Sequence, residues 1–174
     1  MPRSYSAALP IAIVVLRILI VLNWLSGLAI FALLVATIVA QQWTFTALGI
    51  TPDSGIPGQI MGLRAVAALG LVVVAFNYAI LKRLVAMVAS VRAGDPFVAA
   101  NAYRLQAIAW CLLALQLVGL VIAALGHMLS TPAHPLHLDA GFSVNGWVAV
   151  LLTFILARVF AEGTLMREDL EGTV

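Results

Sequence analysis

The chain has 174 residues, of which 64% are hydrophobic and 9% are charged, and its mean hydropathy is +1.13. Soluble domains are about 45–50% apolar and about 25% charged, so this composition excludes a water-soluble fold around one small core. The net charge of +2 is small and dispersed, which argues against direct nucleic-acid binding. Cys111 is the single cysteine of the sequence, so an intrachain disulfide is excluded.

Four apolar segments reach the length of about 17–25 residues that a transmembrane helix needs. They contain no Asp or Glu and cover about residues 18–40, 65–81, 105–126 and 144–161. Lipid cannot hydrogen-bond the backbone, so these spans must be helical. The first apolar run is also longer than a signal peptide's, and we read it as an uncleaved span. We expect an all-α integral membrane protein, a single domain over residues 1–174 with four transmembrane helices in two hairpins.

The basic residues predict the orientation of these helices. The linker of residues 82–104 holds Lys82, Arg83, Arg92 and Arg104, whereas the loops after the first and third spans hold no Lys or Arg apart from Arg64 at the edge of the second span. Cytoplasmic loops carry an excess of these residues, so the linker and both termini are expected to be cytoplasmic. The prediction is a multi-pass protein of the inner (plasma) membrane, with its first two helices extended on the cytoplasmic side.

The linker and the tail of residues 162–174 form the candidate interaction surface. Gly94 suits the position after a helix end, and Asp95-Pro96 suits an N-cap followed by proline. The linker carries four bases and one acid, and the chain from Ala157 onward carries four acids and two bases. Two readings stay open, a solvated helix end and docking of the acidic tail on the basic linker. The candidate surface comprises Arg92, Asp95, Pro96, Phe97, Asn101, Arg104, Arg167, Glu168 and Leu170.

Three polar residues near the cytoplasmic ends of the spans, Asn23, Asn77 and Gln106, form a candidate intramembrane polar layer. Such side chains either hydrogen-bond between helices or line a small ligand or lipid-headgroup pocket. Small residues at four-residue spacing, as at Ala157 and Ala161, allow close helix packing within one chain or in a homo-oligomer.

The third loop offers a weak metal alternative through His127, His134, His137 and Asp139. Its prolines remove any regular spacing, so we expect solvated histidines and no metal. Arg64 lies close to a span end, where snorkelling or pairing with Asp53 accounts for its charge.

Two stretches carry a family resemblance. One is Gly94-Asp95-Pro96-Phe97 with Asn101 and Arg104-Leu105, and the other runs from Val159-Phe160-Ala161-Glu162-Gly163 through Arg167-Glu168. Together with the four-span layout they resemble an uncharacterised bacterial membrane-protein family, DUF2975. The closing Gly172-Thr173-Val174 departs slightly from that family's usual ending. The resemblance implies a small membrane protein, often encoded beside a helix–turn–helix regulator, and it implies no reaction.

The spans contain no carboxylate, no histidine pair and no cysteine pair of the kinds that exporters, dihaem cytochromes and disulfide oxidases need. We therefore expect no catalysis and no cofactor. The leading hypothesis is a regulatory or sensor protein that acts through its linker and tail. The alternative is a small-molecule or lipid carrier that uses the polar layer. Expected partners are membrane lipids, a second copy of the chain, or (by resemblance) a helix–turn–helix regulator.

Overall fold

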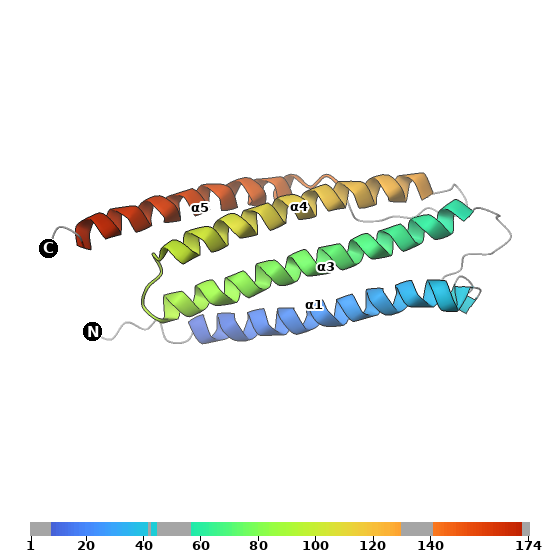
Figure 1. Ribbon diagram of the computed structural model, residues 1–174, viewed down its shortest axis with the longest axis horizontal. Coiled ribbons are helices and arrows are strands. Elements are labelled where there is room, and N and C mark those ends of the chain that lie inside the picture. The colour runs from blue at the N-terminus through green and yellow to red at the C-terminus, as the bar shows by residue number, and fades with distance from the viewer. Residues whose placement is uncertain (1–7, 42, 45–56, 130–140, 172–174) are drawn as a thin grey trace. The chain divides into compact units, whose positions relative to one another are not determined.

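The protein is all-helical in a computed structural model that describes residues 8–41, 43–44, 57–129 and 141–171, with the side chains of 8, 57–59, 129 and 168–171 excepted. Its long helices are α1 (Ala8–Val39), α3 (Pro57–Arg92), α4 (Ala99–Leu129) and α5 (Val144–Glu171) (Figure 1). All four are long and apolar enough to cross a membrane. The predicted four-span, all-α architecture is confirmed, while its orientation stays a prediction.

The helices continue beyond the apolar spans. The first begins at Ala8, and α3 continues past the second span to Arg92. In the same way α5 continues through the predicted tail to Glu171. The turns added to α3 and α5 contain mainly Ala, Leu, Met, Glu, Lys and Arg, which favour helix, whereas half of the residues added to α1 are Ile, Val and Pro, which favour it less.

Two compact units divide the chain, and each contact between helices that is described below lies within one of them. The first unit comprises residues 1–23, 76–115 and 143–174, and the second comprises residues 24–75 and 116–142. In the second unit α1 packs closely on α3, because a Cβ atom placed on Gly27 would lie 2.9 Å from a methyl group of Val74. Gly70 faces Ile30 across the same pair of helices. Glycines at such contacts let helix backbones approach each other.

An arginine joins the same two helices. Arg64 on α3 donates a hydrogen bond from Nη2 to the carbonyl oxygen of Thr37, at 2.6 Å. Thr37 lies in the last turn of α1, where carbonyl groups lack partners within the helix and the helix dipole favours a cation. Arg64 therefore caps the end of α1. Its predicted alternative partner, Asp53, lies outside the described residues.

The turn between α3 and α4 closes with a Schellman motif. Gly94 has a φ of +88°, its N–H donates to Val91, and the N–H of Asp95 donates to Ser90. This pattern places glycine where a left-handed backbone is required, as predicted. The predicted N-cap at Asp95-Pro96 is wrong, because α4 begins at Ala99. The carboxylate of Asp95 binds Arg167 instead of the start of α4.

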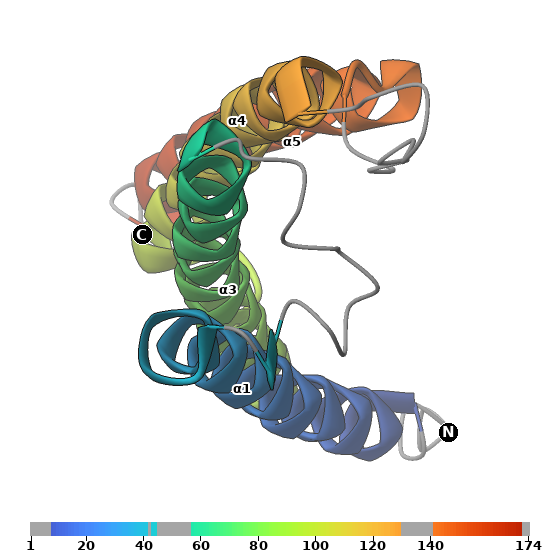
Figure 2. The ribbon, with the colours of Figure 1, turned by 90° about the vertical axis from the view of Figure 1, so that its right-hand side faces the viewer.

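Helices α4 and α5 lie side by side in the first unit (Figures 1 and 2). Leu105, Ile108 and Ala109 of α4 and Ala157 of α5 are buried, and Trp110 packs edge-on against Phe154 with ring centroids 5.3 Å apart. Most other large apolar side chains of these helices are exposed, as expected for helices that face lipid.

Candidate functional site

The turn after α3 contacts the last part of α5. Asp95 and Arg167 form an ion pair, and the rings of Phe97 and Phe160 stack with centroids 5.3 Å apart. Gly163 lies beside this stack, and a Cβ at that position would lie 3.4 Å from the Phe97 ring, in van der Waals contact with it. These five residues, Asp95, Phe97, Phe160, Gly163 and Arg167, are called the clasp below.

Asn101 fixes the shape of the turn from inside. Its side chain is 1% exposed, and its amide nitrogen donates to the Ser90 hydroxyl at 2.6 Å and to the Pro96 carbonyl at 2.9 Å. Its amide oxygen accepts a hydrogen bond from Arg104 at 2.7 Å. One side chain thus links the end of α3, the turn and the first turns of α4. Such a fully satisfied buried polar group makes the turn rigid.

The ion pair of the clasp differs from the one that the docking alternative implied, in which the acidic tail meets the basic linker. The pair consists of the linker's acid, Asp95, and the tail's base, Arg167. Arg158 and Glu162, four residues apart on α5, form a second ion pair at 2.5 Å. Exposed ion pairs contribute about 0.2–1 kcal/mol each to stability. The aromatic stack is therefore expected to contribute much of the stability of the clasp.

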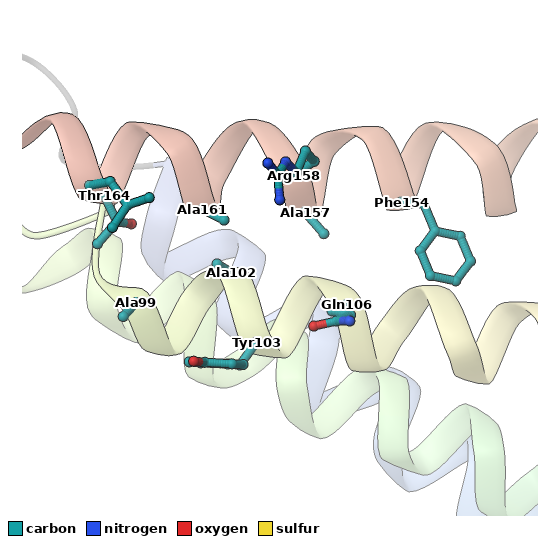
Figure 3. A pocket seen from close by; sticks show the side chains of 10 residues that line it. Ala99, Ala102, Tyr103, Gln106, Phe154, Ala157, Arg158, Ala161 and Thr164 are labelled. Carbon is teal, nitrogen blue, oxygen red and sulfur yellow. The ribbon is translucent and has the colours of Figure 1, made fainter.

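A groove with a volume of about 570 Å³ lies between α4 and α5 beside the clasp (Figure 3). The groove exists because small side chains line it, among them Ala157 and Ala161, which are directed from α5 toward α4. The Phe154 ring lies toward one end of the groove. Its polar lining residues are Tyr103, Gln106, Arg158 and Thr164, and Leu165 also lines it. The groove can therefore accept an apolar group that carries a polar end.

The structure gathers most of the predicted interaction surface. Asp95, Pro96, Phe97, Asn101, Arg104 and Arg167 all take part in the clasp or in the Asn101 network. Arg92 is exposed at the end of α3. The side chains of Glu168 and Leu170 lie outside the described residues.

The predicted polar layer stays a prediction. Gln106 lines the groove between α4 and α5, whereas Asn23 and Asn77 are not among the residues that line it. The candidate metal ligands stay untested as well, because His134, His137 and Asp139 lie outside the described residues.

Three contact residues were absent from the predicted surface. Phe160 and Gly163 belong to the second stretch that carries the family resemblance, so that resemblance contained the signal for them. Ser90 had no such signal, because a helix-end serine gives no indication of a bond to an asparagine eleven residues later.

The clasp lies within the region that a comparison with known families recognises. The sequence model described as "Protein of unknown function (DUF2975)" matches residues 42–174, which include α3, α4 and α5. Searches of curated proteins and of solved structures gave no match. The matched region covers more than half of the chain and contains three of the four candidate spans, those of α3, α4 and α5. The protein therefore belongs to DUF2975, a family of membrane proteins of unknown function.

Proposed function

We propose that this protein is a membrane-embedded interaction protein without catalytic activity, and that it binds a cytoplasmic partner through the clasp and the adjoining groove. The observation that carries the proposal is the contact of Asp95 and Phe97 with Arg167 and Phe160. It joins two segments 72 residues apart in sequence into one surface at the polar ends of the helices.

This surface has the composition of a binding site. Phe97 is 44% exposed despite its stack, and Leu165 and Met166 on α5 are 55% and 63% exposed. Phe97 lies in the linker, and Leu165 and Met166 follow the span predicted over residues 144–161, so the proposal places all three beyond the lipid tails, although the apolar part of α5 extends to Arg167. Interfaces are typically centred on such apolar groups, with a pocket that receives an anchor residue of the partner. The groove beside Leu165 supplies that pocket.

The charge around the surface indicates the kind of partner. Arg92 is exposed at the end of α3, whereas the exposed Arg158 on α5 is paired with Glu162. A partner with an apolar anchor and an acidic group opposite Arg92 is complementary to this arrangement. The family resemblance names one candidate, a small helix–turn–helix regulator that the protein would hold at the membrane.

The proposal is tested by co-expressing the full chain with a helix–turn–helix regulator encoded beside its gene and isolating the complex in mild detergent. Light scattering with size-exclusion chromatography gives its stoichiometry. Replacing Leu165 and Met166 together by serine removes exposed apolar contacts without touching the clasp. We expect at least about tenfold weaker binding, the effect of losing about 1.4 kcal/mol at an interface.

Val91→Ser serves as the matched control, because Val91 is also exposed and lies near the clasp on α3 but outside it. The control should bind as the wild type does. If the wild type and the Leu165/Met166 variant both elute without the regulator, or bind it equally, the proposed function is wrong.

A further inference from the structure

A second pocket, formed by α3 and α4 within the first unit, is lined by three cations. Lys82 and Arg83 of α3 and Arg104 of α4 share a pocket of about 450 Å³ with Tyr78, Ala79 and Ala86. Positions 79, 82, 83 and 86 lie on one face of α3, because residues three and four apart are neighbours on a helix. No carboxylate lines it among the residues that the structure describes.

The described residues do not neutralise these charges. The ion pairs seen in the described ranges, Arg158–Glu162 and Asp95–Arg167, involve none of the three cations. Arg83 donates to the carbonyl oxygen of Ala79 at 2.8 Å, and Arg104 donates to Asn101. These neutral acceptors orient the two guanidinium groups and leave their charge available. Three positive charges around one cavity repel each other, so an anion that enters it is stabilised.

The position of the pocket indicates which kind of anion it binds. Ala79 belongs to the last turn of the second apolar span, Lys82 and Arg83 follow that span, and Arg104 directly precedes the third. The cavity therefore lies at the boundary between apolar and polar sequence, the depth at which lipid headgroups lie. Arginine and lysine are the residues that bind phosphate oxygens, and basic pockets between membrane helices accept lipid phosphates.

We propose that this pocket binds the phosphodiester headgroup of an anionic phospholipid, such as phosphatidylglycerol, from the adjoining leaflet. Lys82, Arg83 and Arg104 contact the phosphate, and the acyl chains follow the apolar spans. The site is separate from the clasp and from the groove between α4 and α5, so it does not depend on the proposed function.

The test measures lipid binding to the purified full chain by native mass spectrometry, with titrated phosphatidylglycerol and with phosphatidylcholine for comparison. The variant Lys82→Gln/Arg83→Gln removes two charges. At about 1 kcal/mol for each cation near a lipid surface, the apparent Kd for phosphatidylglycerol should rise roughly 30-fold. The matched control is Arg92→Gln, which removes one charge from the same helix outside the pocket. It should leave the Kd unchanged.

Lys82 is exposed, so Lys82→Gln keeps the test decisive if the double variant does not fold. On its own it should raise the Kd about fivefold. Equal affinity for the two lipids, or equal loss in the Arg92 control, would overturn the proposal by showing non-specific attraction.

Inorganic phosphate is titrated in a third arm without anionic lipid. Binding of phosphate that is as tight as that of the lipid and equally sensitive to Lys82→Gln would show a soluble ligand, and would also overturn the lipid proposal.

Discussion

At the scale of single residues, Asn101 holds the linker in place. Replacing it with leucine keeps the branching at Cγ and the number of heavy atoms but removes the donor to Ser90 and Pro96 and the acceptor for Arg104. Leaving such buried groups without partners costs about 1–3 kcal/mol. We expect Asn101→Leu to lower the free energy of unfolding by that amount. Tryptophan fluorescence during unfolding in mixed detergent–SDS micelles measures the change.

Asn145→Leu is the control for this prediction, since Asn145 is exposed near the start of α5. It should unfold at the wild-type SDS fraction. Equal stability of Asn101→Leu and wild type would mean that the Asn101 network does not stabilise the turn.

At the scale of helices, the close contact of α1 with α3 depends on Gly27. Alanine there places a methyl group 2.9 Å from Val74, whose branched side chain has little freedom to move aside. Overpacking of this kind costs about 1–3 kcal/mol. Gly119→Ala is the matched control, because no atom lies within 4 Å of its new methyl group.

In the control, alanine's better helix propensity should stabilise the protein by about 0.5–1 kcal/mol. Gly27→Ala gains the same propensity, so the difference between the two variants isolates the helix contact. The measurement is the same unfolding experiment. Two variants that are stabilised equally would show that α1 and α3 do not approach each other at Gly27.

Length and hydropathy were sufficient to predict the four helices, because a membrane span requires a long apolar run whatever its neighbours are. Gly94 was predicted correctly as a helix end, since its left-handed backbone is a local requirement. The cap at Asp95 was predicted wrongly because its carboxylate binds a residue 72 positions away, and no local pattern encodes that pairing. The same reason explains why the groove between α4 and α5 could not be foreseen. Its volume depends on which alanines of two distant helices face each other.

At the scale of the whole molecule, the distribution of basic residues predicts that the linker is cytoplasmic and the loop after α4 is external. Two exposed positions report on these sides, Val91 in the last turns of α3 and Met128 in the last turn of α4, which are 41% and 82% exposed. Because α4 crosses the membrane once between them, they must lie on opposite sides. In a Cys111→Ser background, each is replaced by cysteine and treated with a membrane-impermeable maleimide.

In right-side-out vesicles we expect labelling of Met128→Cys and none of Val91→Cys until the membrane is opened. Inside-out vesicles should give the reverse pattern and serve as the control for reactivity. The opposite orientation would place four cations outside the membrane, whereas an excess of Lys and Arg normally marks the cytoplasmic side. These cations are Lys82, Arg83, Arg92 and Arg104. If Val91→Cys is labelled first in right-side-out vesicles, the orientation is inverted. The clasp would then face outward, where no DNA-binding regulator could reach it.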